Sequence, residues 1–420
     1  MKNMRKMSVS NKAVIIGGGA AGLFCAGLAA QRGLDVTVLD KNAKPARKLL
    51  ITGKGRCNVT NNCTPEDFLQ NVRTNPRFLY SAIHAFAPAD TMRFFEERGV
   101  PLKTERGSRV FPVSDKAVEI VDTLTAFAKQ SGVKIVPKTR AAAVSCENGA
   151  VTGVVCEDRQ KFDAAAVVIA TGGASYPLTG SNGDGYRLAA QLGHSVIPSR
   201  PSLVPVVTAE PWCAEMMGLS LKNVTLTLKN ANNKVVYQEL GEMLFTHFGI
   251  SGPLVLSASS YMTEPPQTYR MSIDMKPALE PDQLDARILR DFEEQKNKDF
   301  ANSLDALLPR KMIPVVVRLS GIPADTKVNS VTREQRRKLV SLIKALPLTP
   351  IRFRPIEEAI ITSGGVSVKE ISPKTMESKL INGLFFAGEV IDVDAFTGGF
   401  NLQIAFATAF LAAQSLCPEQ

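Results

Sequence analysis

Three glycines near the start of the chain stand at the spacing of a dinucleotide-binding turn. Gly17, Gly19 and Gly22 follow an apolar segment and precede an Ala-rich one, and a second apolar segment ends on Asp40. This order predicts strand, turn, helix and second strand, with an acid about 20 residues after the glycines. Gly17 allows the tight turn, Gly19 lets the backbone approach a pyrophosphate, and Gly22 lets helix and strand pack closely. The helix N-terminus can then hold the pyrophosphate, while Asp40 can accept hydrogen bonds from a ribose.

Three later segments match the needs of FAD rather than NAD. Residues 47–61 hold two glycines among cations and small polar residues, and can wrap phosphate and approach a flat ring. Residues 170–185 follow a continuous apolar run and are rich in glycine. Residues 383–401 place an acid after a strand, where it can bond ribityl hydroxyls, and a Gly-Gly turn at a helix N-terminus, where it can lie against the flavin pyrimidine. Each alone could be a plain strand-to-helix turn, but together they predict FAD.

The predicted cofactor-binding residues come from all four segments. They are Gly17, Gly19, Ala20, Ala21, Gly22, Asp40, Lys41, Lys48, Gly53, Gly55, Arg56, Cys57, Asn58, Thr171, Gly172, Gly173, Asp184, Gly388, Glu389, Asp392, Gly398, Gly399, Phe400 and Asn401.

Positive charge is concentrated near the N-terminus of this chain, whose net charge is +10. Residues 1–62 contain eleven Lys or Arg and only two acids, and six of the cations lie between Lys41 and Arg56. We interpret these six as a basic rim around a dinucleotide phosphate. A solvated loop and a nucleic-acid patch are the alternatives.

Cysteine and histidine usage argues against metal and dithiol chemistry. The cysteines form no C-x-x-C pair, and the three histidines are far apart in the sequence, so we expect no metal site. Scattered cysteines fit reduced thiols in the cytosol. An apolar run preceded by the cations Lys2, Arg5, Lys6 and Lys12 imitates a signal peptide, but the glycines and the charged strand end argue against one. We therefore predict a soluble, cytoplasmic protein.

The chain alternates strand and helix signals up to about residue 195, then changes character, and returns to the α/β pattern after a Pro-rich stretch. We predict an α/β protein whose FAD-binding domain comprises 1–195 and 353–420, with 196–352 inserted. The insert should be β-rich, with a helical part at about 278–346. The clearest signals in the insert are a hairpin at 224–236 and helices at 282–298 and 332–346. In the FAD-binding domain, a final helix is predicted at 401–413.

Several motifs together resemble those of a known flavoprotein family. They are residues 17–22, 53–58, 173–177, 244–253, 387–389 and 397–401. Over nearly its full length the chain resembles the BaiN-like family of NAD(P)/FAD-dependent oxidoreductases, also called aminoacetone-oxidase-like flavoproteins. The resemblance implies a glutathione-reductase-like Rossmann FAD-binding domain with an inserted β-rich and helical domain. Members have been linked to reduction of conjugated double bonds in oxo-bile acids and to amine oxidation.

A more distant similarity concerns residues 362–366 together with 383–389. These segments are similar to the C-terminal flavin-binding part of fumarate-reductase-like and ketosteroid-dehydrogenase-like proteins. The similarity favours reduction of an activated C=C bond, as in an enone or an oxo-steroid, through flavin N5. No second GxGxxG is present, so NADH or NADPH would bind transiently over the flavin. The alternatives are an amine oxidase that uses oxygen and an RNA-associated flavoprotein, for which no RNA-binding motif is present.

Four residues are candidates for roles at the reacting centre. His247 and Tyr176 could supply the proton. His247 is in a Gly- and Ser-rich segment of the insert that could form a lid, with its glycines as hinges, and Tyr176 is in a Tyr-Pro turn. Arg56 could hold a substrate carboxylate or carbonyl, or neutralise phosphate. Cys57 lies between Arg56 and Asn58, and these surroundings could lower its pKa, although packing near the flavin is the favoured role.

Overall fold

The computed structural model describes residues 11–416, which form two compact units. Lys2, Arg5, Lys6 and Cys417 lie outside the described residues. The first unit comprises the chain up to Pro201 and from Ala359 onward, and the inserted unit comprises Ser202–Glu358. None of the helices within residues 11–416 is both long and apolar enough to span a membrane.

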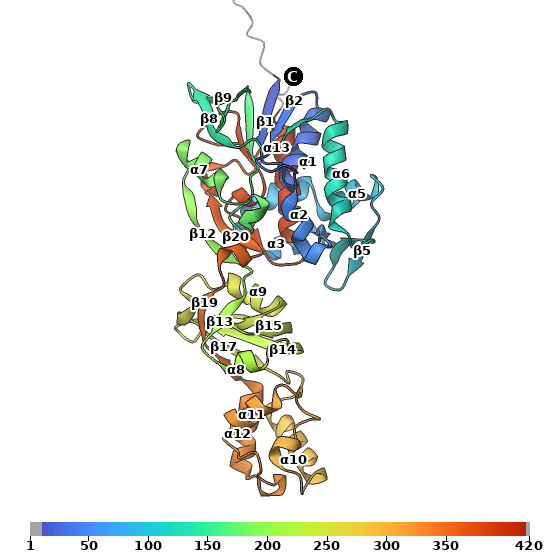
Figure 1. Ribbon diagram of the computed structural model, residues 1–420, viewed down its shortest axis with the longest axis vertical. Coiled ribbons are helices and arrows are strands. Elements are labelled where there is room, and N and C mark those ends of the chain that lie inside the picture. Colours follow the sequence, from blue (N-terminus) through green and yellow to red (C-terminus); the bar gives the residue numbers. More distant parts are fainter. Residues whose placement is uncertain (1–10, 417–420) are drawn as a thin grey trace, which may run out of the picture. The chain divides into compact units, whose positions relative to one another are not determined.

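A five-stranded parallel sheet forms the centre of the first unit (Figure 1). Its strands, in spatial order, are β21 (Leu384–Phe386), β11 (Ala166–Ile169), β1 (Lys12–Ile16), β2 (Asp35–Leu39) and β7 (Lys134–Val136). Strands β11 and β21 are buried throughout, as expected of parallel strands covered on both faces. Because all five strands run the same way, their carboxyl ends meet at one edge, where the predicted cofactor segments follow β1, β2, β11 and β21.

Helices and small sheets surround this sheet. The helices are α1 (Ala20–Gln31), α2 (Arg47–Ile51), α3 (Pro65–Gln70), α4 (Tyr80–Ala85), α5 (Pro88–Glu96), α6 (Ala117–Gln130), α7 (Asp184–Gln191) and α13 (Phe400–Ser415). The small sheets are β10 (Lys161–Asp163), β9 (Ala150–Cys156) and β8 (Ala141–Glu147); β3 (Thr60–Asn61), β6 (Arg109–Pro112) and β5 (Leu102–Glu105); β22 (Asp394–Ala395) and β4 (Val72–Thr74); and β12 (Val196–Ser202) and β20 (Ile361–Val366).

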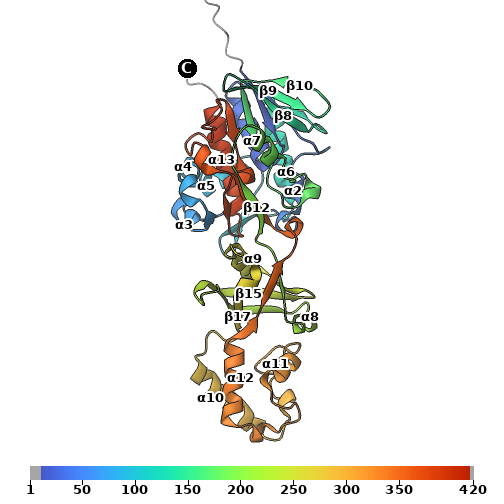
Figure 2. The same cartoon turned by 90° about the vertical axis from the view of Figure 1, so that its left-hand side faces the viewer.

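Two central helices are apolar on nearly every face. Helix α1 packs against α13 and α6, and Figure 2 shows α4 and α5 beside α13. A helix that is apolar on every face is stable only when it is buried. The run of small residues predicted at 401–413 belongs to such a helix, α13, which packs against α1. Gln403 fixes α13 because its side-chain oxygen accepts hydrogen bonds from the hydroxyls of Thr60 (2.7 Å) and Thr91 (2.6 Å).

The inserted unit contains a seven-stranded antiparallel sheet. Its strands, in spatial order, are β18 (Leu346–Leu348), β17 (Arg270–Asp274), β14 (Ser220–Lys229), β15 (Val235–Thr246), β16 (Gly249–Ser251), β13 (Val206–Thr208) and β19 (Pro350–Phe353). Its helices are α8 (Trp212–Glu215), α9 (Pro253–Ser260), α10 (Pro281–Glu294), α11 (Ile313–Ser320) and α12 (Arg333–Lys344). Within this unit α9 lies on one side of the sheet and α10 to α12 lie on the other (Figure 2).

The structure differs from the predicted elements at several boundaries. Strands β12 and β20 pair, so residues just after 196 stay with the first unit, whereas Arg354 stacks on Phe248, 4.6 Å from its ring centroid, and stays with the insert. The helix expected to end at residue 298 ends at Glu294. Two prolines of the Pro-rich stretch, Pro347 and Pro350, lie in β18 and β19. These are the two edge strands, where a missing N–H costs least.

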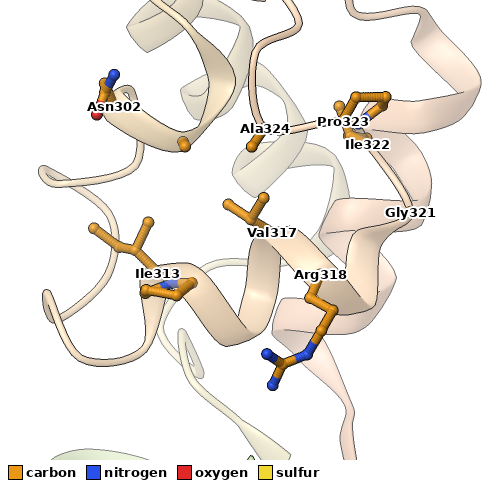
Figure 3. A pocket seen from close by; sticks show the side chains of 10 residues that line it. Asn302, Ile313, Val317, Arg318, Gly321, Ile322, Pro323 and Ala324 are labelled. Atoms are coloured by element: carbon orange, nitrogen blue, oxygen red, sulfur yellow. The ribbon is translucent and has the colours of Figure 1, made fainter.

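A shallow pocket of about 660 Å³ lies in the helical part of the inserted unit (Figure 3). Ile313, Val317 and Ile322 contribute apolar surface, and Arg318 at its edge donates to Glu215 at 2.8 Å. None of the predicted site residues lines this pocket.

A buried histidine joins the end of the first unit's α/β segment to its C-terminal part. The His194 ring lies 3.2 Å (Nδ1) from a carboxylate oxygen of Glu370 and 2.9 Å (Nε2) from the hydroxyl of Ser378. That hydroxyl also accepts the backbone N–H groups of Leu380 and Ile381. Burial lowers the pKa of His194 below its ordinary value of 6.5, although the Glu370 carboxylate opposes the shift.

We expect His194 to make folding stability fall in mild acid. Because its pKa is lower in the folded state, the unfolded chain binds more protons once the pH drops below about 6.5. The contribution is complete above that pH and is lost at up to about 1.4 kcal/mol per pH unit as the pH falls through the lowered pKa. Urea unfolding of the parent and His194→Gln over a pH series measures this, and parallel curves for the two proteins would contradict it.

Candidate functional site

The turn between β1 and α1 has the geometry that its three glycines predict. Gly17 has φ +107°, and a Cβ there would lie 2.5 Å from the Ala170 carbonyl oxygen. A Cβ on Gly22 would lie only 1.8 Å from the Gly17 carbonyl oxygen, because the helix packs directly against the turn. A Cβ on Gly19 would meet nothing within 4 Å. The space in front of the α1 N-terminus is therefore open to an anionic group.

Asp40 follows β2 and is turned toward this glycine turn. Its carboxylate accepts the backbone N–H of Gly18 at 3.0 Å and that of Asn42 at 2.7 Å. Burial raises the pKa of Asp40, and the two backbone hydrogen bonds oppose that shift. A carboxylate has about four acceptor positions, so capacity remains for ribose hydroxyls. The ribose contact stays a prediction.

Replacing Asp40 with alanine should weaken FAD binding. Losing two ribose hydrogen bonds at about 1 kcal/mol each corresponds to roughly a thirtyfold rise in the FAD dissociation constant. Fluorescence titration of the apoprotein with FAD measures this. Asp35→Ala is the matched control, because Asp35 begins the same strand and is exposed. Equal FAD affinity in Asp40→Ala and Asp35→Ala would show that Asp40 does not face the ribose.

The loop after α2 is coiled by a run of left-handed residues. Gly53, Lys54, Gly55 and Cys57 all have positive φ, and the two non-glycine residues lie in a region that L side chains rarely adopt. Cys57 is fully buried, and burial raises the pKa of its thiol to about 12, which contradicts the alternative of a lowered pKa. The buried side-chain oxygen of Asn58 has no hydrogen-bond partner among the described residues. An orphaned buried acceptor beside this loop fits a bound cofactor that supplies a donor.

Three of the six cations between residues 41 and 56 are ion-paired with acids of the first unit. The pairs are Lys41 with Asp184 (2.7 Å), Lys48 with Glu389 (2.6 Å), and Arg56 with Glu105 and with Asp115 (2.6 Å). The other three, Lys44, Arg47 and Lys54, are exposed. Only half of the predicted basic rim is therefore unneutralised positive charge, because the other three cations form ion pairs that connect loops. Asp184 is also bonded to Arg140, and its contact with FAD stays a prediction.

A polar cluster joins three separate segments around Glu389. One carboxylate oxygen of Glu389 accepts the Thr362 N–H at 3.0 Å and the Ser175 hydroxyl at 3.2 Å, while the other accepts Lys48 at 2.6 Å. Lys48 also donates to Ser175 at 2.7 Å. A Cβ on Gly173 would lie 2.8 Å from the Glu389 carboxylate, so this glycine allows the close approach.

The glycine turn at the start of α13 is fixed from both sides. Gly398 and Gly399 have φ of +126° and +95°, and a Cβ on Gly399 would lie 2.2 Å from the Thr60 carbonyl oxygen. The Asn401 side chain bonds the Ala395 backbone in both directions, at 2.8 and 2.9 Å. Asn401 therefore shapes this turn directly, while the backbone N–H groups at the α13 N-terminus carry the positive end of the helix dipole.

Asp392 and the remaining predicted residues belong to the same first unit. Asp392 accepts a hydrogen bond from the Asn75 side chain at 3.1 Å, and burial raises its pKa. The remaining residues are Ala20 and Ala21 in α1, Thr171 and Gly172 after β11, Gly388 in the turn after β21, and Phe400 at the start of α13.

The three catalytic candidates have different surroundings. Tyr176 has φ +54° in the turn before a short 3-10 helix. Arg56 is bonded to two acids and lies 4.1 Å from the centroid of the Phe111 ring, so its contacts show a role in holding the β5–β6 hairpin. His247 is exposed in the inserted unit, in the turn between β15 and β16. A proton-donating role for Tyr176 or His247 stays a prediction.

The segment around His247 is not the glycine-hinged loop that the sequence predicted. Strands β15 and β16 pair directly across its two-residue turn. A Cβ on Gly249 would lie 2.6 Å from the Val206 carbonyl oxygen, and one on Gly252 would lie 2.9 Å from Met243 Cα. These glycines therefore allow close backbone contacts within the sheet unit and are not free hinges.

Three positioning residues were not among the predicted site residues. Thr362 and Ser175 complete the Glu389 cluster, and Asn61 donates to the Gly398 carbonyl at 3.0 Å. Each lies inside or beside a recognised motif, which was the available signal. Their roles depend on contacts between residues far apart in the sequence, which spacing does not reveal.

The donor set of the first unit fits FAD. The open N-terminus of α1 suits a pyrophosphate, Asp40 a ribose, and the α13 turn an electron-rich ring edge. The model of the HI0933-like protein Rossmann domain matches residues 11–415. The chain belongs to this family.

Several relatives of this HI0933-like chain match it over nearly its full length. Two are named ribosomal RNA dihydrouridine synthase. The one from Escherichia coli K12 is 34% identical over 96% of this chain and 97% of its own length, and the one from Haemophilus influenzae is 34% identical over 98% and 99%. The 3-dehydro-bile acid delta(4,6)-reductase of Clostridium scindens is 30% identical over 96% and 98%.

Solved structures show the same fold at low identity. The open conformation of a flavocytochrome c3 fumarate reductase has a TM-score of 0.52 at 17% identity, covering 97% of this chain and 78% of that one. The 3-ketosteroid-delta4-(5alpha)-dehydrogenase of Rhodococcus jostii RHA1 has a TM-score of 0.51 at 14% identity, covering 98% and 99%. The predicted Rossmann FAD-binding fold is confirmed, and this HI0933-like protein is an FAD-dependent oxidoreductase.

Proposed function

We propose that this chain reduces a C=C bond conjugated with a carbonyl group, and that its substrate is a uridine base of ribosomal RNA. The observation that carries the proposal is the full-length match to two proteins named ribosomal RNA dihydrouridine synthase, at 34% identity. The match covers both units of this chain, so it includes the inserted unit as well as the FAD-binding one.

The relatives' names describe one kind of chemistry on two classes of substrate. Dihydrouridine is uridine with its C5=C6 bond saturated, and that bond is conjugated with the C4 carbonyl. A delta(4,6)-reductase of a 3-dehydro bile acid likewise saturates bonds conjugated with a carbonyl. Reduction of an activated C=C bond is therefore supported by both names, and it is the reaction that the sequence favours.

The first unit supplies the groups that would hold and polarise the flavin for this reaction. FAD bound here, once reduced, would supply a hydride from flavin N5 to one carbon of the double bond. The α13 N-terminus and the Gly398–Gly399 turn stabilise negative charge on a ring edge placed there, and the Glu389 cluster fixes the neighbouring loops. A proton must reach the other carbon, for which Tyr176 and His247 are the proposed donors. NADH or NADPH is the proposed source of the hydride.

Charge favours RNA over a steroid as the substrate. The sequence by itself favours a small molecule over RNA, because no RNA-binding motif is present. The net charge of +10 and the exposed cations Lys44, Arg47 and Lys54 beside the predicted phosphate loop suit a polyanion, whereas a bile acid carries a single carboxylate.

Anaerobic reoxidation of the flavin tests the proposal. The protein is reduced by NADPH or NADH and mixed with unmodified large-subunit ribosomal RNA transcript, a 3-oxo-delta-4 steroid, or oxygen. We expect rapid reoxidation by the transcript, with dihydrouridine detected in its nucleosides by mass spectrometry. Reoxidation by the steroid alone would replace RNA with a small enone as the substrate. In a parallel arm amines replace NADPH and NADH as reductants, and flavin reduction by an amine followed by reoxidation only by oxygen would favour the amine oxidase.

Replacing His247 tests its part in the reaction. If His247 donates the proton, His247→Ala should lower kcat roughly a hundredfold or more and leave FAD content unchanged. If it only lines a substrate surface, KM should rise while kcat holds. Tyr176→Phe is the parallel variant, because it removes one hydroxyl from the other candidate. Unchanged kcat and KM in His247→Ala would place this residue outside the reaction.

A further inference from the structure

The tip of the β5–β6 hairpin lies beside the glycine turn that opens α13. Asn61 connects the two, because its side-chain amide donates to the Gly107 carbonyl at the hairpin tip and to the Gly398 carbonyl, each at 3.0 Å. Asn61 also belongs to β3, which pairs with β6. One side chain therefore joins the hairpin tip to the segment predicted to lie against the flavin ring.

Two arginines flank Gly107 at this tip. Arg106 and Arg109 are both exposed, and neither has an acidic partner among residues 11–416. The Nε of Arg109 donates to the Arg106 carbonyl at 3.0 Å, which ties its side chain across the turn. The planar guanidinium groups thus keep donors for an anionic ligand, and their fork geometry suits phosphate oxygens.

The residues around these arginines add to the positive charge. Residues 54–56 and 103–116 contain six Lys or Arg and only two acids, Glu105 and Asp115. Arg56 and Lys103 share those two acids, with Lys103 lying 2.7 Å from Asp115. Lys54 and Lys116 are exposed in addition to the arginine pair. The excess cations therefore belong to the surface and not to internal ion pairs.

We propose that Arg106 and Arg109, with Lys54, form a phosphate-binding rim that holds an RNA backbone beside the flavin end of the site. This inference rests on the proposed function and names the surface through which that substrate docks. Phosphate contacts fix the position of a nucleic acid without reading its sequence, which is the task of a rim next to a reaction centre. A substrate with one carboxylate would need one cation, whereas several exposed cations near one hairpin fit a chain of phosphates.

The test compares two double variants with the same change in charge. Arg106→Gln/Arg109→Gln removes the rim arginines, and Lys134→Gln/Lys161→Gln removes two exposed lysines from β7 and β10 of the same unit. Binding of labelled large-subunit ribosomal RNA transcript is measured over a series of salt concentrations. The rim variant should bind roughly tenfold more weakly, and its slope of log affinity against log salt should fall by about 2. The control should match the parent.

Small-molecule chemistry separates this inference from the proposed function. FAD content and flavin reoxidation by a small enone should be equal in the parent and the rim variant. If the parent forms dihydrouridine in RNA and the rim variant does so with unchanged KM, the docking surface is wrong and the function stands. If the rim variant loses RNA binding but the parent forms no dihydrouridine, the surface stands and the function is wrong. Equal losses of RNA affinity in both double variants would show that only the overall charge matters, and would overturn the inference.

Discussion

Gly22→Ala should strongly destabilise the FAD-binding unit, whereas Gly19→Ala should leave the fold intact and weaken FAD binding. A Cβ on Gly22 would lie 1.8 Å from the Gly17 carbonyl oxygen, so α1 would have to move away from the turn. Overpacking against backbone typically costs 1–3 kcal/mol and occasionally more, and we expect about 3 kcal/mol or more here. A Cβ on Gly19 meets nothing within 4 Å, and its φ of −81° is open to any residue.

The pair of variants separates folding from cofactor binding. Urea unfolding of the apoproteins should show a large loss for Gly22→Ala and a change within about 1 kcal/mol for Gly19→Ala. FAD titration should show at least roughly tenfold weaker binding for Gly19→Ala, because the new methyl group occupies the space in front of the helix N-terminus. Parent-like FAD affinity in Gly19→Ala would show that the pyrophosphate does not lie there.

Glu389→Gln should lower stability and FAD retention together. The Glu389 carboxylate accepts hydrogen bonds from Lys48, Ser175 and Thr362, and its side chain is 14% exposed. In the Glu389→Gln variant the side-chain NH₂ group would face either the Lys48 ammonium or the Thr362 N–H, and both of these are hydrogen-bond donors that need an acceptor. Without the Glu389 carboxylate the largely buried Lys48 ammonium has no counter-charge in this pair, and we expect the free energy of unfolding to fall by about 2–3 kcal/mol. The predicted ribityl contact of Glu389 would be weakened as well.

The Glu389 effect can be tested against a more exposed ion pair and by a double-mutant cycle. Glu105→Gln affects the Arg56 pair, whose side chains are about one-third exposed and where Asp115 still serves Arg56, so a loss within about 1 kcal/mol is expected. Combining Glu389→Gln with Lys48→Met should cost less than the sum of the single changes, because no unpaired charge remains. Additive losses would show that the pair is not coupled.

The sequence was sufficient for features that depend on local order along the chain. The glycine spacing, the alternation of apolar segments and the acid after the second strand predicted the strand–turn–helix unit around Gly17, Gly19 and Gly22. The same reasoning predicted FAD, the parallel sheet and a β-rich insert with a helical part. These succeed because hydrophobic period and turn chemistry act within a few residues, where sequence is directly readable.

Local reasoning failed where a residue's environment comes from elsewhere in the chain. Cys57 has cationic and polar neighbours in sequence, yet burial raises the pKa of its thiol to about 12. The glycines after His247 look like hinges, yet backbone of the inserted unit lies against them. In each case a distant segment determines solvation or contact.

Sequence alone therefore determined the class of fold and the cofactor, because those follow from short-range patterns of glycine, apolar and acidic residues. The segments predicted to surround the cofactor stay a prediction. Only the tertiary structure decided which charges are neutralised. It paired Lys48 with Glu389 across more than 300 positions and left Arg106 and Arg109 without acidic partners among the described residues. Coulomb interactions fall off with distance in space, so the charge that a ligand meets is set by the folded chain and not by neighbours along it.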